Sequence, residues 1–404
     1  MRCGLLGERL GHSYSPQIHR CLGEYSYDLF EVSPENLENF LKSGTWDAIN
    51  VTIPYKKAVM EYCAQIAPEA KRIGAVNTLV RRADGIHGYN TDYHGFAAMV
   101  RKSGVALGGK KVLVLGSGGA SATVQAVLTD LGAHPVVISR SGPDHYENLG
   151  RHVDAAAIVN TTPVGMYPNV EAAPLSLEGF SGLEAVLDVV YNPARTVLLL
   201  DAERRGIPAE NGLYMLVAQA RKAAEYFTDT VLSTELEGKI YETLARQMEN
   251  IVLIGMPGCG KSTVGRLVAQ ALNRAFVDAD RAFAQRWGRT PAEVIRAEGE
   301  ETFRRMESQI LADLCKAAGT VIATGGGCVT RPENHAHLHR NSRIFWLRRD
   351  VEKLPTIGRP LSQRNTPAQL YRQREPLYRE FADEIVDNDG SIQATADFIV
   401  AQYR

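Results

Sequence analysis

The sequence predicts an α/β protein that consists of two parts, each built around its own glycine-rich loop. Its 404 residues are enough for about two to three domains. A strand–glycine turn–helix–strand pattern lies in the middle of the chain, and a phosphate-loop pattern follows near residue 255. Both patterns are typical of parallel sheets covered by helices, so we expect two such sheets in one polypeptide.

The composition is that of an ordinary globular protein. Apolar residues make up 45% of the chain and the formal net charge is −1, so we expect neither a nucleic-acid partner nor a membrane surface. No apolar run approaches the ~18 residues of a membrane span, and the N-terminal residues lack the layout of a signal peptide. The six cysteines are scattered without a C-x-x-C pair, which favours reduced thiols in a cytoplasmic protein.

Two serines stand where the first strand gives way to a helix. The apolar run Cys3–Leu6 predicts the opening strand, and Pro16 suits the first turn of the following helix. Ser13 and Ser15 lie between them, and two hydroxyls at a helix start can hold a carboxylate. The alternative interpretation is that Ser15 simply caps the helix.

Polar residues interrupt the next apolar segments, AINVTIPYKKAV, IGAVNTLV and GYNTDYHGF. Asn50, Thr52 and Asn77 must find partners, either with each other or with a ligand. Lys56 and Asp92 lie in the same segments, and a Lys–Asp pair can move a proton to or from a hydroxyl whose carbon is being oxidised. A lone lysine is more often a solvated surface charge, so Lys56 is informative only together with Asp92.

The segment KKVLVLGSGGASATVQAVLTDLGAHPVVISR has the form strand, glycine turn, helix and second strand. It predicts a dinucleotide site, because glycines let the backbone approach a pyrophosphate at the helix N-terminus. Ala122 stands near the place of a third glycine, where alanine is a tolerated variant. The turn consists of Gly116, Ser117, Gly118, Gly119 and Ala120.

The end of the second strand bears on which dinucleotide is bound. An acidic residue there would bond the ribose 2′-OH of NAD, but the chain has Ser139 and Arg140, which favours the 2′-phosphate of NADP. Alternatively, Arg140 is an ordinary surface residue. The strand-like segments AAAIVNTT and EAVLDVVY follow, as a doubly wound sheet requires, and then the helical segment GLYMLVAQARKAAEYF.

The first part of the chain resembles shikimate dehydrogenase over about residues 1–245, because eight segments typical of that family occur in order: HSYSP, NVTIPYK, GAVNTL, GYNTDYHGF, the glycine turn, VNTTPVGM, DVVYNPARTVLL and GLYMLVAQA. The resemblance implies NADPH-dependent reduction of 3-dehydroshikimate to shikimate, with Lys56 and Asp92 as the catalytic pair. It implies a shikimate site formed by Ser13, Ser15, Thr52, Asn77, Asp92, Tyr191 and Gln219. It implies an NADP site formed by Gly116, Ser117, Gly118, Gly119, Ala120, Ser139, Arg140, Val189 and Gly212.

The chain departs from this family beside the expected 2′-phosphate. Family members that prefer NADP often carry Asn-Arg-Thr and a second basic residue a few positions on. This chain reads Ser139-Arg140-Ser141, with Asp144 beyond. The dinucleotide site itself is unaffected by this difference.

A phosphate loop opens the last part of the chain. Helix-like sequence runs to about Gln247 and meets a new apolar strand at Ile251, which places a boundary near residues 248–250. The strand and the loop that follows it read IVLIGMPGCGKST. The loop fits the pattern G-x-x-x-x-G-K-[ST] and precedes a helix. Its backbone N–H groups can cradle an anion, while Lys261 can reach the outer phosphates and Ser262 can bind Mg²⁺. A chance glycine-rich turn is the alternative.

Two carboxylates and a glycine run follow. Asp278 and Asp280 are expected on one face of an extended segment, one for the water shell of a metal and one for a substrate hydroxyl, unless they form a solvated strand end. The segment VIATGGGCVT predicts a buried strand that ends where backbone can approach a ligand closely.

We expect a polar loop rather than a metal site at three alternating histidines, because no cysteine or acidic partner has zinc spacing. These are His335, His337 and His339.

The last part resembles shikimate kinase over about residues 249–404, because GMPGCGKST, FVDADRAF, GEETFR, TGGG, RPL and REPLY occur in the order and spacing of that family. The resemblance implies phosphorylation of shikimate by Mg²⁺ and ATP on a parallel sheet of the nucleoside monophosphate kinase type. It implies that Lys261, Asp280 and Arg359 are catalytic and that Ser262 and Asp278 serve the metal. ATP would bind at Gly258, Cys259, Gly260, Lys261, Ser262, Thr263 and Arg359, and shikimate at Asp280, Arg304, Gly326 and Arg374. The lid segment KLPTIGRPL, which carries Arg359, is shorter than is usual in the family.

Taken together, the sequence predicts a fusion of two enzymes that act on consecutive steps, with 3-dehydroshikimate and shikimate as their small-molecule substrates. One alternative is a quinate/shikimate dehydrogenase that oxidises quinate with NAD. Another is a ligand-sensing protein without turnover, which would be expected to have lost catalytic residues that are present here. The predicted domains are 1–105 for substrate, completed by helices within 212–247, then 106–211 as a Rossmann NADP domain and 249–404 as a phosphate-loop kinase domain.

Overall fold

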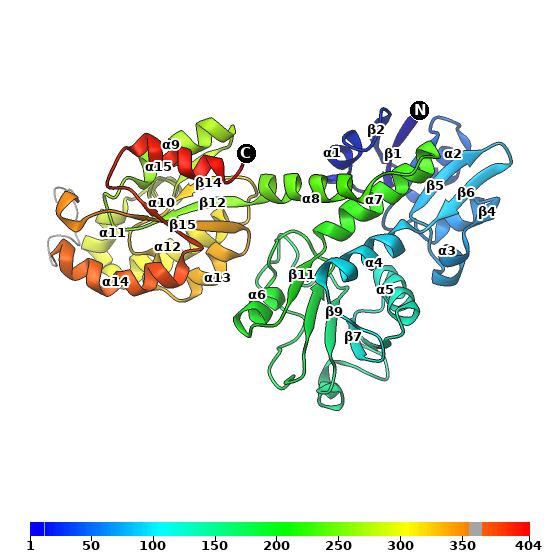
Figure 1. Cartoon of the computed structure of the whole chain (residues 1–404), viewed down its shortest axis with the longest axis horizontal. Coiled ribbons are helices and arrows are strands. Elements are labelled where there is room, and N and C mark those ends of the chain that lie inside the picture. Colours follow the sequence, from blue (N-terminus) through cyan, green and yellow to red (C-terminus); the bar gives the residue numbers. More distant parts are fainter. Residues whose placement is uncertain (12, 355–365) are drawn as a thin grey trace. The chain divides into compact units, whose positions relative to one another are not determined.

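The computed structural model describes residues 1–11, 13–354 and 366–404 (Figure 1). It divides into two compact units, of which the first comprises Met1–Tyr191 and Leu198–Thr243 and the second comprises Asn192–Val197 and Leu244–Arg404. The described part of the chain holds three sheets, two of them wholly parallel. This confirms the predicted α/β fold class.

The first sheet has six strands in the order β2-β1-β3-β5-β6-β4. Strands β1, β2 and β3 run parallel, while β5 is antiparallel to both β3 and β6. All residues of β3 are buried, because helices cover both faces of the sheet: Ile49 packs with Leu41 on one face and Ala48 packs with Phe227 on the other. The elements are β1 (Arg2–Gly7), α1 (Ser15–Arg20), β2 (Ser26–Glu31), α2 (Leu37–Lys42), β3 (Ala48–Val51), β4 (Gln65–Ile66), α3 (Pro68–Ile73), β5 (Thr78–Arg82), β6 (Gly85–Tyr89) and α4 (Thr91–Ser103).

The second sheet is parallel, with the order β11-β10-β9-β7-β8. The chain first adds β8 on one side of β7 and then β9 on the other, so the strand order reverses at β7. Ligands of doubly wound sheets bind at such a switch point, beyond the carboxyl ends of the strands, and the glycine turn directly follows β7. The elements are β7 (Lys111–Leu115), α5 (Gly119–Asp130), β8 (His134–Ile138), β9 (Ala157–Asn160), β10 (Ala185–Asp188), α6 (Val197–Arg204), β11 (Ala209–Asn211), α7 (Leu213–Thr228) and α8 (Thr234–Met248).

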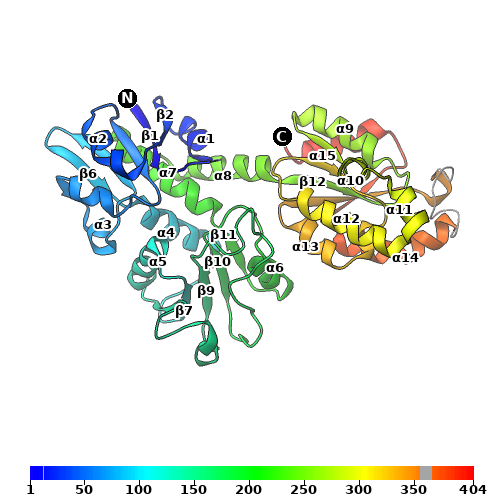
Figure 2. The same cartoon turned by 180° about the vertical axis from the view of Figure 1, so that it is seen from behind.

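The third sheet is also parallel, with the order β13-β14-β12-β15-β16. Helices α9 and α15 pack against each other on one face, and α12, α13 and α14 lie on the other (Figures 1 and 2). Its central strand β12 is buried throughout. The elements are β12 (Asn250–Ile254), α9 (Lys261–Leu272), β13 (Phe276–Asp278), α10 (Ala279–Trp287), α11 (Pro291–Glu298), α12 (Glu300–Leu314), β14 (Val321–Ala323), α13 (Glu333–His339), β15 (Ser342–Arg348), α14 (Pro367–Phe381), β16 (Glu384–Asp387) and α15 (Ile392–Ala401).

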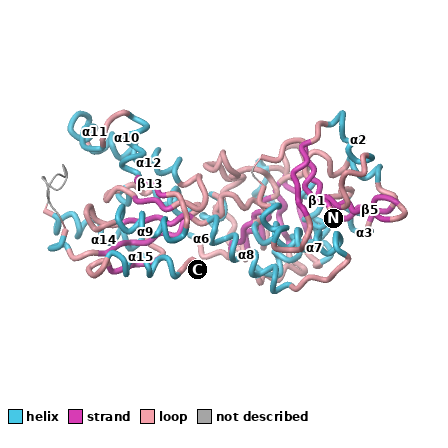
Figure 3. The backbone as a smooth tube through the Cα atoms, turned by 90° about the horizontal axis from the view of Figure 1, so that it is seen from above, coloured by secondary structure: helices cyan, strands magenta, loops and turns pink. Residues whose placement is uncertain are grey.

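Two local expectations about carboxylates and serines differ from the structure. The first concerns the segment of β13 and α10, both labelled in Figure 3. Asp280 lies in the first turn of α10 rather than in an extended segment, because Asp278 caps that helix by accepting from the backbone N–H of Asp280. The helix α1 begins at Ser15 itself, and its cap residue, Tyr14, makes no side-chain capping bond. The alternative that Ser15 caps the helix is therefore wrong.

The alternating histidines belong to a helix. The prediction of a polar loop was wrong, because His335, His337 and His339 lie on α13. No cluster of three metal-binding side chains occurs within residues 1–11, 13–354 and 366–404.

None of the helices in the described part of the chain combines the length and apolarity needed to cross a bilayer. Arg359 and most of the predicted lid lie outside the described residues.

Candidate active sites

The first unit contains a cavity of about 290 Å³ that is lined from both of its sheets. Every residue predicted for the shikimate site lines it, together with three residues predicted for the NADP site, Ala120, Val189 and Gly212. The structure therefore brings together residues that are separated by up to 206 positions, from Ser13 to Gln219. Asn50, which the sequence analysis expected to meet a neighbour or a ligand, lines the cavity as well. Sequence reasoning assigned no role to the further lining residues Leu5, Val51, Met215 and Leu216.

Lys56 and Asp92 form an ion pair at the edge of this cavity. The Nζ atom of Lys56 lies 2.6 Å from Oδ2 of Asp92, and the two side chains are 28% and 17% exposed. The Lys56 carbonyl accepts from the N–H of Val76, which fixes the turn after β3. Asp92 lies in the first turn of α4, and the side chain of Asn90 caps that helix. The pair thus has the reach and the water access that proton transfer to a bound hydroxyl requires.

Tyr191 and Gln219 close the cavity from the side of the second sheet and α7. Burial raises the pKa of the Tyr191 phenol, so the group remains a neutral hydrogen-bond donor. Gln219 can reach the cavity because α4 and α7 pack closely at Gly95. A Cβ atom at position 95 would lie 2.6 Å from the carbonyl oxygen of Met215 and 2.9 Å from Cβ of Gln219.

The glycine turn after β7 fits a pyrophosphate. Gly116 has φ +104°, and a Cβ atom there would lie 2.9 Å from Cγ2 of Thr162. A Cβ atom at Gly118 or Gly119 would meet no atom within 4 Å, so open space lies in front of the N-terminus of α5. A helix N-terminus with exposed N–H groups favours an anion at this position.

The loop after β8 presents one basic residue. Ser139 is buried and Arg140 is exposed, and no ion pair of Arg140 occurs within the described ranges. Asp144 is the nearby acidic residue, and its Oδ1 lies 2.9 Å from Nε2 of His152. The carboxylate of Asp144 is therefore already engaged, while the guanidinium of Arg140 faces solvent.

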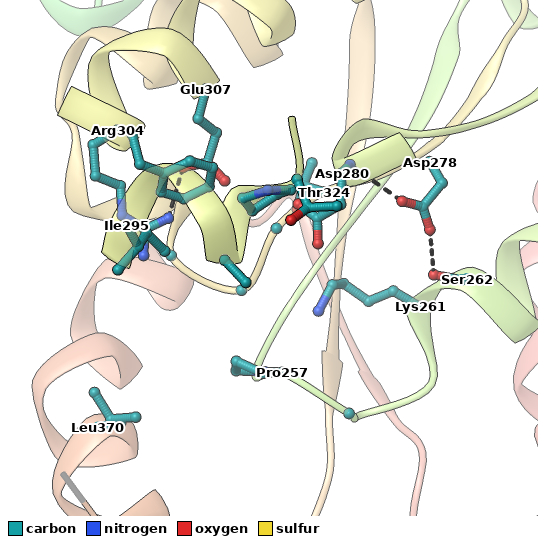
Figure 4. A pocket seen from close by; sticks show the side chains of 18 of the residues that line it. Pro257, Lys261, Ser262, Asp278, Asp280, Ile295, Arg304, Glu307, Thr324 and Leu370 are labelled. Carbon is teal, nitrogen blue, oxygen red and sulfur yellow. Dashed lines mark hydrogen bonds and ion pairs between the residues drawn. The ribbon is translucent and has the colours of Figure 1, made fainter. Parts of the chain in front are cut away.

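The second unit contains a cavity of about 570 Å³ beside the phosphate loop (Figure 4). It is lined by all of the predicted kinase-site residues that the structure describes except Cys259. The side chain of Cys259 is buried behind the loop, and its carbonyl accepts from Nδ2 of Asn388 at 2.5 Å. The predicted residues on the cavity wall are Gly258, Gly260, Lys261, Ser262, Thr263, Asp278, Asp280, Arg304, Gly326 and Arg374.

The phosphate loop is held by its own lysine and by β13. Nζ of Lys261 donates to the carbonyl oxygens of Gly255 at 2.8 Å and Met256 at 3.0 Å. The hydroxyl of Ser262 donates to Oδ2 of Asp278 at 2.6 Å (Figure 4). A hydroxyl and a carboxylate this close offer hard oxygen ligands, which suits Mg²⁺ and its water shell. The residues present therefore fit a metal-bound triphosphate.

A glycine run brings a buried ion pair up to the opposite wall of the cavity. Nη1 of Arg304 donates to Oε2 of Glu307 at 2.7 Å on α12 (Figure 4). A Cβ atom at Gly327 would lie 2.0 Å from Nη2 of Arg304, and one at Gly325 would lie 2.3 Å from Oε1 of Glu307. A side chain at Gly325 or Gly327 would therefore force Glu307 or Arg304 to shift. Arg374 is buried as well and donates to the carbonyl of Gly326 at 3.2 Å, so two guanidinium groups are available for a carboxylate ligand.

Glu307 was missed by sequence reasoning. It is buried, and burial raises its pKa, an effect that Arg304 opposes and Asp280 reinforces. Its position three residues after Arg304 on a helix was a usable signal, because residues at this spacing are neighbours. A charged pair at that spacing is usually solvated, however, and only the tertiary packing shows that this one is not.

Comparisons with known proteins match two families in succession. A family model described as the shikimate dehydrogenase substrate binding domain matches residues 5–79, and one described as shikimate kinase matches residues 257–404. The shikimate dehydrogenase (NADP(+)) of Clostridium beijerinckii is 35% identical over 267 residues, which covers 61% of this chain and 98% of that protein. That of Symbiobacterium thermophilum is 36% identical over 257 residues, covering 55% and 87%.

Solved structures show the same likeness for the front part. A chorismate mutase/shikimate 5-dehydrogenase fusion protein from Clostridium acetobutylicum is 38% identical with a TM-score of 0.58, covering 60% of this chain and 96% of that one. The shikimate 5-dehydrogenase of Thermus thermophilus, solved in complex with NADP(H) and shikimate, is 30% identical with a TM-score of 0.55 and covers 60% and 98%.

Proposed function

The chain belongs to the shikimate dehydrogenase family over about its first 60% and carries a shikimate kinase domain in residues 257–404, and from this premise we propose the reactions and the residues that perform them. It is a bifunctional shikimate-pathway enzyme. Its first unit reduces 3-dehydroshikimate to shikimate with NADPH. Its second unit transfers the terminal phosphoryl group of ATP to shikimate with the help of Mg²⁺. The observation that carries the proposal is that each unit gathers its described candidate substrate-binding and catalytic residues around one cavity.

In the first unit, Lys56 and Asp92 manage the proton of the hydroxyl that is formed. Bound NADPH supplies the hydride to the substrate carbonyl. Lys56 delivers a proton to the oxygen of that carbonyl, and Asp92, 2.6 Å away, holds the ammonium group in place. The hydroxyls of Ser13 and Ser15, which line the same cavity, bind the substrate carboxylate.

In the second unit, the residues orient the reactants and neutralise charge. ATP supplies the phosphoryl group, and Ser262 and Asp278 would hold Mg²⁺, which would offset the charge of the phosphates. When ATP binds, Nζ of Lys261 exchanges its bonds to the carbonyl oxygens of Gly255 and Met256 for bonds to the outer phosphates. Asp280 orients the attacking hydroxyl of shikimate, while the buried guanidinium groups of Arg304 and Arg374 bind its carboxylate.

A single product assay tests both activities. The full chain is supplied with 3-dehydroshikimate, NADPH, ATP and Mg²⁺, and shikimate and shikimate 3-phosphate are measured separately. We expect both products, and we expect no phosphate ester when ATP is left out. A second assay with quinate and NAD tests the quinate alternative. Oxidation of quinate at a rate above that of shikimate with NADP would contradict the proposed substrate.

Arg140 should decide the preference for NADPH. Replacing Arg140 with alanine should raise the Kd of NADPH by about 10- to 100-fold, the scale of a lost hydrogen bond to a charged group, and leave the Kd of NADH nearly unchanged. Both constants are measured by cofactor fluorescence. Arg204→Ala, which removes another exposed arginine of the same unit, is the control. An equal loss for both cofactors would show that Arg140 does not bind the 2′-phosphate.

Shikimate should pass between the two reactions through bulk solution. Each cavity is lined by residues of one unit alone. We therefore expect that isotope-labelled 3-dehydroshikimate, supplied with excess unlabelled shikimate, gives shikimate 3-phosphate whose label is diluted in proportion to the bulk pool. Label that resists dilution would show direct transfer and would contradict this expectation.

A further inference from the structure

Two threonines lie directly behind the cavity of the first unit without lining it. Thr78 and Thr91 are completely buried, and their hydroxyl oxygens lie 3.2 Å apart. They contact three amide side chains that do line the cavity, Asn50, Asn77 and Gln219. An amide side chain can face a ligand with either its oxygen or its NH₂ group. Its hydrogen-bond partners on the side away from the cavity decide which of the two groups faces the ligand.

The orientation of Asn77 follows from a neighbour that can only donate. The backbone N–H of Thr91 lies 2.7 Å from the side chain of Asn77, so the atom that receives this bond must be the oxygen, Oδ1. The hydroxyls of Thr78, at 3.1 Å, and Thr91, at 3.2 Å, approach the same oxygen. The oxygen is thus fully engaged behind the cavity, and the NH₂ group of Asn77 is left for the ligand.

The orientation of Gln219 follows from a neighbour that can only accept. The backbone carbonyl of Leu216 lies 2.9 Å from Nε2 of Gln219, so this end is the NH₂ group. The oxygen Oε1 then points to the hydroxyl of Thr91 at 3.3 Å. Thr91 therefore connects Gln219 on α7, through its hydroxyl, with Asn77, through its backbone N–H, and it directly precedes the catalytic Asp92 on α4.

Asn50 is oriented from its other side. The hydroxyl of Tyr27 donates to Oδ1 of Asn50 at 2.8 Å, and burial raises the pKa of this phenol, so it keeps its proton. The NH₂ group of Asn50 consequently donates to the oxygen of Thr78 at 3.1 Å. The hydroxyl of Thr78 in turn donates its proton to Oδ1 of Asn77. The hydrogen bonds thus run in one direction, from Tyr27 through Asn50 and Thr78 to Asn77.

We propose that Thr78 and Thr91 are positioning residues of the dehydrogenase, which lock the amide of Asn77 so that it presents a hydrogen-bond donor to a hydroxyl oxygen of the substrate. The proposal rests on the proposed function, because it assigns the cavity to shikimate. A free amide would be able to turn its oxygen to the ligand and would then bind a hydroxyl less selectively. The hydrogen bonds of Thr78 and Thr91 fix the orientation of the amide before the substrate binds.

The test is the Michaelis constant for shikimate in NADP-dependent oxidation. Thr78→Val and Thr91→Val each remove one buried hydroxyl and should raise the KM of shikimate by about three- to tenfold, the scale of one net hydrogen bond. The kcat and the Kd of NADP should change by less than about twofold, because neither side chain touches the ion pair or the glycine turn. Thr78→Ser and Thr91→Ser, which keep the hydroxyl, should restore the KM. Thr228→Val removes a hydroxyl of α7 that, within the described residues, bonds only to the carbonyl of Ala224 and to Thr230, and it is the matched control.

A purely structural role would give a different result. It would lower the melting temperature and the fraction of active enzyme while the KM stayed at the wild-type value, and that outcome would overturn the proposal. If the valine variants do not fold, Asn77→Asp provides an independent test, because it keeps the oxygen that faces Thr91 and removes the donor. Wild-type shikimate binding by Asn77→Asp would equally overturn it. A wild-type chain that does not oxidise shikimate would instead contradict the proposed function, before any variant is compared.

Discussion

Lys56→Ala should lower the kcat of the dehydrogenase by about 10²- to 10⁴-fold, the usual contribution of a positioned proton donor, and should leave the kinase unchanged. The physical reason is that alanine removes the ammonium group that lies 2.6 Å from Asp92 in the cavity of the first unit. The KM of NADPH should not change, because Lys56 does not belong to the glycine turn. The loss of NADPH absorbance and the formation of shikimate 3-phosphate from added shikimate are measured on the same preparation.

The adjacent lysine supplies the control for this experiment. Lys57 is exposed, and Lys57→Ala should retain wild-type activity in both assays. The kinase reaction provides an internal measure of the amount of chain in each sample. Dehydrogenase turnover close to wild type in Lys56→Ala would remove Lys56 from the mechanism.

Asp280→Asn should lower the kcat of the kinase by at least about 10²-fold, while nucleotide binding is retained. The amide keeps the shape of the side chain but loses the charge and basicity that orient an attacking hydroxyl. The phosphate loop is unaffected, because Lys261 and Ser262 bond to other partners. Nucleotide binding is measured by calorimetry and phosphoryl transfer by product formation. Reduction of 3-dehydroshikimate should continue at the wild-type rate.

An acidic residue on the outer surface of the same unit provides the comparison. Asp397 lies on α15 and bonds only to Gln393 in the described structure, so Asp397→Asn should leave phosphoryl transfer unchanged. If Asp280→Asn phosphorylated shikimate as fast as this control, the acceptor hydroxyl would have to bind elsewhere.

Residues in strongly patterned segments could be placed from the sequence, because a parallel sheet brings the ends of its strands to one edge. Lys56 follows β3 and Asp92 follows β6, two strands that run in the same direction in the mixed first sheet, and both residues line the first cavity. Lys261 follows β12 of the parallel third sheet and lines the second cavity. Glu307 and Thr78 could not be placed. Their importance depends on what packs against them, and a buried carboxylate or hydroxyl looks like an exposed one in the sequence.

Local hydrogen bonding explains the element boundaries that were wrong. Asp278 ends β13 and starts α10 at once, because its side chain accepts two backbone N–H groups, an arrangement that the alternation of charged and apolar residues in FVDADRAF did not reveal. The run PENHAHLHR was predicted as a polar loop rather than a metal site, yet it forms α13. There the buried side chain of Asn334 donates to the carbonyl of Cys328, which ties the polar segment to the protein.

The bond between Asn388 and the carbonyl of Cys259 has a consequence for the order in which the activities arise during translation. Asn388 lies between β16 and α15, is almost completely buried, and accepts from Thr395 at 2.7 Å while it donates to the phosphate loop. The loop is synthesised 129 residues earlier than the side chain that holds it. We therefore expect a ribosome-bound nascent chain that exposes only residues up to about 380 to reduce 3-dehydroshikimate but not to retain ATP, and release of the last residues to switch on the second reaction.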